Sequence, residues 1–256
     1  MAIRVNNLNI EDGTSYIVEE VSFKSVPNRT VFSVPISRRP GDKLTGVEWG
    51  NKSIQIKGRI FSTTTSGLRG NIDTLQQNFA VQSLALSIDL DRTYTATLTK
   101  LDIPNLFYNQ TMAQFDAEFL SVDPFSYANQ VTVSGTVISG TLTYSGSITI
   151  SGTVFAEPLL TINPTGANVG NSGIKNMTIT HVPTGENITI SGMINYASPF
   201  TIDYNNFLTT NSGINTDYVG IFSRWEPGVV NYLITVSSGV LQGFNYTWQY
   251  QPRFYN

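Results

Sequence analysis

The sequence predicts a mainly β protein with two domains, of which the first carries a single α-helix. Apolar and polar residues alternate with a period of two along many short segments, which is typical of strands with one buried face. Apolar residues fall at helical spacing in one stretch, residues 66–80. The composition also changes near residue 123, from segments with ordinary charged residues to segments rich in Thr, Ser, Gly and Asn. These three observations define the predicted fold class.

The first half of the chain has the clearest strand pattern. Ile54, Ile56 and Ile60 alternate with the polar residues Gln55 and Lys57, so the segment presents one apolar and one wet face. The same alternation predicts strands at residues 18–23, 84–90 and 115–120. Further strands are predicted at residues 31–34, after a Pro27-Asn28 turn, and at the β-branched residues 93–101.

Residues 66–80 form the predicted helix. Its apolar stripe consists of Leu68, Ile72, Leu75 and Phe79. Ser66 is the expected N-cap, because a serine hydroxyl can accept a hydrogen bond from a backbone N–H of the first turn. Gly70 destabilises a helix by roughly 1 kcal/mol relative to alanine. The helix is therefore expected to depend on the packing of its stripe.

A rigid turn is predicted where the composition changes. Pro124 fixes its own φ angle and restricts Asp123 to extended geometry, so a strand is expected to leave the first domain here. Phe125 and Tyr127 follow two residues apart, so their aromatic side chains are suited to fix the position of the chain where it leaves the first domain. We therefore expect an interdomain joint at these four residues. The predicted domains are residues 1–128 and 129–256.

The second half is predicted to be an antiparallel β-sandwich. Many short strands rich in Thr and Val are separated by turn residues, a pattern typical of that architecture. These strands are expected at residues 131–140, 147–154, 158–162, 177–180, 187–190 and 232–236. The last strand, residues 244–255, alternates aromatic and polar residues and ends in an arginine beside aromatics. We expect that tip to be suited to docking.

Composition excludes several function classes. Charged residues make up 13% of the chain, about half of the usual ~25%, so Asn, Thr and Ser or partner proteins are expected to cover the surface. The net charge of −3 provides no basic field for recruiting nucleic acid. The absence of cysteine excludes disulfides and thiol chemistry. No signal peptide is visible at the N-terminus, so we expect a chain made and kept soluble in a cytoplasm.

No catalytic, cofactor-binding or metal-binding set emerges from the sequence, and we expect a protein that is not an enzyme and has no cofactor. His181 is the single histidine and is interpreted as an ordinary strand-end residue. Carboxylates occur in pairs that a glycosidase could use, but turns and wet strand faces account for them. These pairs are Glu19 with Glu20, Asp89 with Asp91, and Asp116 with Glu118.

Aromatic residues are frequent in the second half and have two interpretations. Tyr196, Trp225 and Trp248 are candidates for stacking on a sugar ring across a sandwich face. Core packing or burial in an interface is the alternative. The sequence leaves the choice open.

Four features resemble the distal tail protein (Dit) family of long-tailed siphophages. The strand Ile54–Ile60 precedes the helical stripe Leu68–Phe79, which leads to the strand Leu84–Leu90 and an Asp91-Arg92-Thr93-Tyr94 turn. Phe119 to Tyr127 resembles the F-x-x-x-D-P-F-x-Y junction of the family. Phe222 to Asn231 resembles its late pattern of an aromatic residue, Pro-Gly and Asn before a strand. The resemblance covers nearly the whole chain in order.

The resemblance implies a structural virion protein. The first domain would be a β-sandwich with one helix that forms a homohexameric ring at the distal tip of a phage tail. The second would be a galectin-like, or jelly-roll, sandwich. The ring would join the tail tube protein to the tail-tip protein and leave a channel through which DNA passes without specific binding.

Ring contacts need strand pairing at sheet edges or apolar patches repeated around an axis. The candidates for these contacts are Ile54, Ile56, Ile60, Leu84 and Leu86. The alternative function is a lectin-like, receptor-binding protein in which the second domain binds a host surface glycan.

Overall fold

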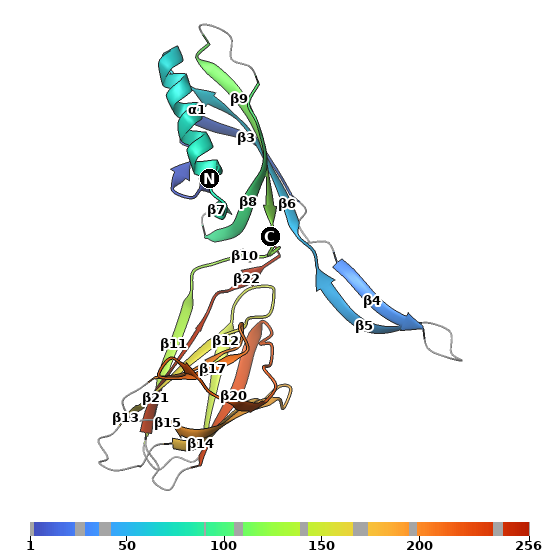
Figure 1. The fold of residues 1–256 in the computed structure, drawn as a ribbon, viewed down its shortest axis with the longest axis vertical. Helices are drawn as coiled ribbons and strands as arrows, with labels where there is room; N and C mark the ends of the chain where they lie inside the picture. Colours follow the sequence, from blue (N-terminus) through green and yellow to red (C-terminus); the bar gives the residue numbers. More distant parts are fainter. Residues whose placement is uncertain are drawn as a thin grey trace. The chain divides into compact units, whose positions relative to one another are not determined.

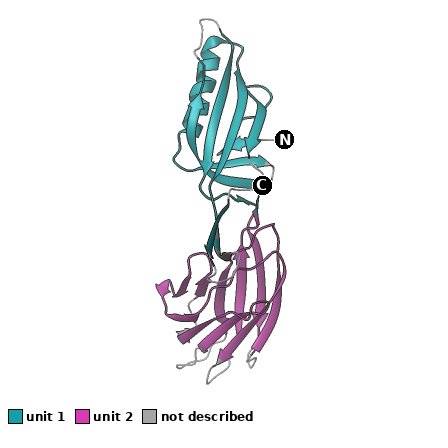
Figure 2. Ribbon diagram, turned by 90° about the vertical axis from the view of Figure 1, so that its right-hand side faces the viewer, with its two compact units in different colours: residues 1–128, 254–256 teal, residues 129–253 magenta. Residues whose placement is uncertain are grey.

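The computed structural model describes residues 3–23, 29–35, 42–89, 91–104, 110–138, 143–165, 174–194, 199–237 and 243–255. The chain divides into two compact units, shown in Figure 2. Unit 1 comprises residues 1–128 together with 254–256, and unit 2 comprises residues 129–253. The division predicted from the sequence assigns the last three residues to the second domain, whereas they pack with unit 1. The chain therefore passes between the units twice.

Unit 1 is built on one nine-stranded antiparallel sheet (Figure 1). The main path through it runs β2-β1-β7-β8-β9-β6-β3. β8 pairs with β7 through its first residues and with β9 through its last ones, so the sheet has two halves that share this strand. Its strands are β1 (Arg4–Val5), β2 (Leu8–Asn9), β3 (Tyr16–Phe23), β6 (Lys52–Phe61), β7 (Leu84–Asp89), β8 (Arg92–Asp102), β9 (Met112–Ser121), β10 (Ser126–Tyr127) and β22 (Arg253–Phe254).

The core of unit 1 follows from strand alternation. Ile54, Ile56 and Ile60 are fully buried on one face of β6, as the period of two predicts. Buried residues from both halves of the sheet belong to one hydrophobic cluster with the helix stripe. The halves therefore enclose a common core, which confirms the predicted β-sandwich with one helix.

The helix α1 spans Thr65–Phe79. All four residues of the predicted stripe are buried, and the Phe79 ring packs edge-on against Phe119 with centroids 5.3 Å apart. The predicted N-cap was wrong by two residues. Thr64, not Ser66, is the cap: its Oγ1 accepts a hydrogen bond from the Gly67 N–H at 3.1 Å. Helix formation thus begins one residue earlier than expected.

A separate two-stranded sheet completes unit 1. β4 (Arg29–Pro35) and β5 (Asp42–Trp49) pair antiparallel from Arg29 opposite Trp49 to Pro35 opposite Asp42, with a register shift between Phe32 and Ser33. Among the described residues, this hairpin pairs with no other strand. The strand predicted at 31–34 is thereby confirmed.

Unit 2 is a sandwich of two antiparallel sheets. The six-stranded sheet runs β11-β21-β13-β16-β17-β18, and the five-stranded sheet runs β12-β20-β14-β15-β19. The first contains β11 (Val131–Val137), β13 (Leu159–Thr165), β16 (Phe200–Asp203), β17 (Leu208–Asn211), β18 (Ile214–Asn215) and β21 (Gly243–Tyr250). The second contains β12 (Thr143–Ile150), β14 (Ile174–His181), β15 (Asn187–Ile194), β19 (Tyr218–Gly220) and β20 (Gly228–Ser237).

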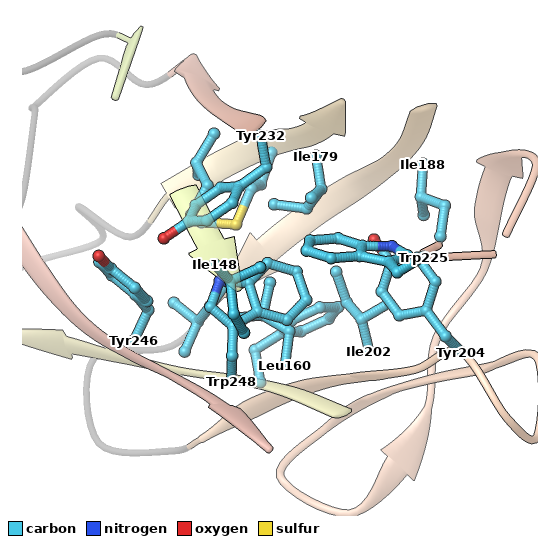
Figure 3. Packing of buried hydrophobic residues seen from close by; sticks show 14 of the residues in the cluster. Ile148, Leu160, Ile179, Ile188, Ile202, Tyr204, Trp225, Tyr232, Tyr246 and Trp248 are labelled. Carbon is cyan, nitrogen blue, oxygen red and sulfur yellow. The ribbon is translucent and has the colours of Figure 1, made fainter. Parts of the chain in front are cut away.

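Aromatic residues dominate the core between these sheets (Figure 3). Trp225 and Trp248 are fully buried, with ring centroids 4.6 Å apart. Ile148 and Ile179 from one sheet and Leu160 and Ile202 from the other belong to the same cluster. Because each sheet contributes its inner face to one core, the sandwich predicted for the second half is confirmed.

Two glycines inside strands have a specific packing role. Gly135 in β11 pairs with Tyr246 in β21, and Gly146 in β12 pairs with Tyr232 in β20. A Cβ atom at either glycine would overlap the tyrosine ring opposite. These two glycines therefore make room for cross-strand aromatic side chains.

Candidate assembly surface

Three exposed apolar side chains lie on one strand of the β4–β5 hairpin of unit 1. Val31, Phe32 and Val34 of β4 are 60%, 43% and 54% exposed. An isolated two-stranded hairpin is only marginally stable in water, and exposed apolar side chains gain free energy when a partner covers them. The hairpin therefore presents an apolar surface that burial against a partner would stabilise.

The base of the hairpin is anchored to unit 1 by aromatic rings. The Arg29 guanidinium lies 3.9 Å from the centroid of the Trp49 ring, within cation–π distance. Trp49 in turn packs against Phe125 at 5.7 Å and Tyr255 at 5.1 Å between centroids. Phe125 is 6% exposed, so the cluster connects the hairpin to well-packed structure.

The predicted joint residues form a compact turn. The Asp123 carboxylate accepts a hydrogen bond from the Phe125 N–H at 3.2 Å and another from the Tyr127 hydroxyl. The Asp123 carbonyl accepts one from the Ser121 hydroxyl. Pro124 is buried. These contacts give the turn several mutually supporting restraints within unit 1, which suits the rigid exit expected from the sequence.

Lys52 anchors the C-terminal tail on unit 1. It is 2% exposed, and its Nζ donates to the Tyr94 hydroxyl and to the Tyr255 carbonyl, both at 2.9 Å. The same ammonium lies 4.7 Å from the ring centroids of Phe23 and Tyr94. Burial disfavours the charged form and lowers the pKa of Lys52 to about 8.

The tail itself docks within its own chain. Phe254 lies beneath the Arg92 guanidinium, 3.8 Å from the ring centroid, and Tyr255 packs against Phe125 at 5.9 Å. The aromatic tip, which the sequence suggested was suited to docking, thus packs on unit 1. The sequence analysis did not identify Lys52 as the residue that binds the tail. Lys52 lies on the same face of β6 as the buried Ile54 and Ile56.

The five residues predicted to make ring contacts require a correction. Ile54, Ile56, Ile60, Leu84 and Leu86 are at most 1% exposed and belong to the unit 1 core. β6 lies between β3 and β9, and β7 lies between β1 and β8, so neither is an edge strand. Neither their side chains nor their strands are available to a neighbouring subunit.

The glycan-stacking candidates also require a correction. Trp225 and Trp248 are fully buried in the unit 2 core and cannot stack on a sugar ring. Tyr196 lies outside the described residues. The core-packing interpretation of the two tryptophans is therefore correct.

His181 is a buried core residue of unit 2. It is 3% exposed, its Nδ1 lies 2.8 Å from the Thr184 hydroxyl, and its ring packs on Trp225 with centroids 5.4 Å apart. Burial lowers the pKa of His181, although the charges of Glu186 and Glu226 oppose the shift.

Three of the six paired carboxylates have structural partners. Glu19 and Glu20 form ion pairs with Arg59 at 2.5 Å and Lys57 at 3.2 Å. Asp116 accepts two hydrogen bonds from the Gln55 amide, and Asp91 is exposed.

Among the described residues, no group of three His, Cys, Asp or Glu side chains could hold a metal ion. No helix in that part of the chain is long and apolar enough to cross a membrane.

The fold and these surfaces define a mainly β, two-unit protein with an exposed apolar hairpin on unit 1. Among solved structures, the crystal structure of the SPP1 Dit protein is similar over 99% of this chain and 98% of that chain. The TM-score is 0.69 and the identity 15%. The chain therefore has the two-domain fold of SPP1 Dit, as the resemblance in its sequence implied.

Other comparisons add little. The phage P2 baseplate in its activated conformation with Ca is similar over 97% of both chains at 10% identity, but the TM-score of 0.46 carries no argument. No family model and no curated protein matches the sequence.

Proposed function

We propose that this protein is a structural subunit of the adsorption hub at the end of a phage tail. The observation that carries the proposal is the likeness to SPP1 Dit, which extends over nearly the full length of both chains. SPP1 Dit is described as a paradigm of the hub adsorption apparatus in phages that infect Gram-positive hosts. A shared fold over both chains favours a shared structural role over an unrelated one, and the burial of Trp225 and Trp248 removes two of the three residues that favoured a lectin.

Unit 1 is proposed to form a homohexameric ring. Closed rings are built from heterologous contacts, in which one surface meets a different surface on the next subunit. The β4–β5 hairpin supplies one such surface, because Val31, Phe32 and Val34 are exposed and its strands pair with no other described strand. In this proposal the hairpin replaces the five core residues that the sequence suggested as ring contacts.

The ring is proposed to join the tail tube protein to a tail-tip protein at the distal tip of the tail. Its channel would let DNA pass without specific binding, which the net charge of −3 supports by providing no excess of cations. The turn at Asp123, Pro124, Phe125 and Tyr127 is proposed as the joint that leads out of the ring-forming unit. The docked tail supports that role, because the chain returns to unit 1 at residue 254.

Light scattering after size-exclusion chromatography tests this proposal. The wild-type protein is expected at six times the 28.1 kDa mass of one chain. Phe32→Glu places a charge on the exposed face of the hairpin and is expected to give monomers, because burying an unpaired charge in an interface is strongly unfavourable. Ile138→Glu is the matched control, since Ile138 is 74% exposed in unit 2. Hexamers that persist in Phe32→Glu would exclude the hairpin as the ring contact.

A further inference from the structure

One edge of unit 2 carries a concentration of exposed apolar side chains. The exposed fractions are 57% for Phe207, 73% for Ile214, 38% for Tyr218, 73% for Val219 and 61% for Ile221. We call these five residues the 207–221 edge. With full areas of about 150–250 Å² for large side chains, they leave roughly 500 Å² of apolar surface open. Patches of this size are often functional, and a standard interface uses about 800 Å² of each partner.

The backbone at the 207–221 edge is also unpartnered on one side. Among the described residues, β18 pairs only with β17 and β19 pairs only with β15. These are the terminal strands of the two sheets, and they are consecutive along the chain. An edge strand presents free N–H and C=O groups that can pair with a strand from another chain.

The side chains of β19 favour strand addition over flat docking. Tyr218 and Val219 are neighbours in an extended strand, so they point to opposite faces of the sheet. Both are exposed. A partner lying flat on one face would cover only one of them, whereas a strand added beside β19 extends both faces and covers both. The geometry therefore fits an extended segment.

Phe207 is held in a strained conformation that exposes its ring. Its φ angle is +53°, in the left-handed region that bulky residues rarely adopt. The turn before it is fixed by Asp203, whose Oδ1 accepts hydrogen bonds from the Asn205 and Asn206 N–H groups, both at 3.0 Å. Backbone strain of this kind persists when the surrounding structure imposes it and is concentrated at functional sites.

The exposed rings of Phe207 and Tyr218 are held in place by contacts with other aromatic residues. Phe207 and Tyr218 both pack edge-on against Phe222, with centroids 5.5 Å and 4.8 Å away. Phe222 packs edge-on against Tyr204 at 5.4 Å, and Tyr204 belongs to the buried core. Pre-organised aromatic side chains lose little entropy on binding, which is typical of interface anchors.

The charge at this edge indicates the kind of partner. In residues 199–223 the only charged residues of the sequence are Asp203 and Asp217, both acidic. Asp217 immediately precedes β19 and is exposed. In space, Arg253 donates to the Asn205 side chain at 3.2 Å, but it is paired with Glu157 at 2.7 Å. Arg224 places its guanidinium 4.4 Å from the Phe155 ring centroid. A complementary segment would carry a lysine or arginine beside its apolar residues.

We propose that the 207–221 edge binds an extended segment of another protein, which adds as a strand beside β19. The segment alternates apolar residues with small polar ones and carries a basic residue opposite Asp217. Main-chain hydrogen bonds would supply affinity, and contacts with Phe207, Tyr218 and Val219 would supply selectivity. This binding is independent of the proposed ring, because it uses unit 2 alone.

Three capped, fluorescein-labelled peptides test the proposal by anisotropy with the full-length protein. The peptide KVTVTVK is expected to bind saturably. EVTVTVE is expected to bind about threefold more weakly, because exposed charge pairs contribute modestly. KVTPTVK is expected not to bind, because proline removes a strand hydrogen bond. Hydrogen exchange in the presence of KVTVTVK is expected to slow at residues 214–221. Equal binding of all three peptides, or protection elsewhere, would overturn the proposal.

Variants separate this role from folding. Val219→Lys is expected to abolish binding of KVTVTVK, whereas Ile138→Lys, at a similarly exposed position outside the edge, retains it. Phe207→Gly relieves the left-handed strain and is expected to weaken binding without lowering the melting temperature. The ring variant Phe32→Glu is expected to bind the peptide normally.

Two outcomes would overturn the proposal and show that the 207–221 edge binds a different partner. Protection of residues 214–221 that depends on protein concentration in the absence of peptide would assign it to a second copy of this chain. Protection by methyl glycosides, but not by KVTVTVK, would assign it to a glycan.

Discussion

The burial of Lys52 predicts that the free energy of unfolding of unit 1 increases between pH 7 and pH 9. The folded-state pKa of Lys52 is about 8, against an ordinary value of 10.5, because its ammonium is buried between two rings and donates hydrogen bonds to uncharged oxygens of Tyr94 and Tyr255. Between these values the unfolded chain binds a proton that the folded chain does not, so stability increases with pH. From pH 7 to pH 9 the linkage amounts to about 1.3 kcal/mol of added stability for unit 1.

Lys52→Met should remove this pH dependence. Methionine has a similar length and packs well against aromatic rings, so unit 1 is expected to fold. Lys57→Met is the control, because Lys57 lies on the wet face of the same strand, where its side chain is 41% exposed and pairs with Glu20. That variant is expected to keep the full increase between pH 7 and pH 9.

Fluorine NMR of protein labelled with 5-fluorotryptophan provides the assay. Trp49 reports on unit 1, whereas Trp225 and Trp248 report on unit 2, so one urea titration gives a free energy of unfolding for each unit. Trp49→Phe assigns the unit 1 signal. The reasoning would be refuted if unit 1 were no more stable at pH 9 than at pH 7, or if Lys52→Met kept the increase.

Two further predictions concern buried polar groups and the helix cap. The pKa of His181 is lowered by burial, so the unfolded chain takes up a proton first as pH falls below about 6.5. The melting temperature of unit 2 should therefore decrease between pH 7 and pH 5, and His181→Gln should remove that decrease; an unchanged slope in the variant would exclude His181 as its cause. Thr64→Ala should destabilise α1 by about 1 kcal/mol in urea unfolding, whereas Ser66→Ala should have little effect. The opposite order would restore Ser66 as the cap.

Local patterns in the sequence predicted the parts of the fold that depend on local geometry. Alternation along residues 54–60 identified both β6 and its buried face, and the stripe from Leu68 to Phe79 identified the buried face of α1. The cap was wrong because Thr64 and Ser66 have equally suitable hydroxyls. The helix start depends instead on where the preceding strand ends, and there the Ser62 N–H bonds to the Thr111 carbonyl. That contact is distant in sequence.

The errors at the predicted site residues have one physical origin. Apolar alternation shows that one face of a strand avoids water, but not whether a core or another subunit covers it. Ile54 and Leu84 proved to be core residues because their strands lie inside the sheet, an order set by pairing between remote segments. The same limit applies to Trp225 and Trp248. Conversely, Lys52 shared the phase of the buried isoleucines, which was a usable signal of its burial.

The central claim is that this chain assembles as the ring of a phage tail hub. Negative-stain electron microscopy of the purified full-length protein tests it most directly. Class averages are predicted to show closed rings with sixfold symmetry and a central channel, which become single particles in Phe32→Glu. Monomers that persist for the wild-type protein alone and with its tail tube and tail-tip proteins, or open filaments in place of closed rings, would contradict the account.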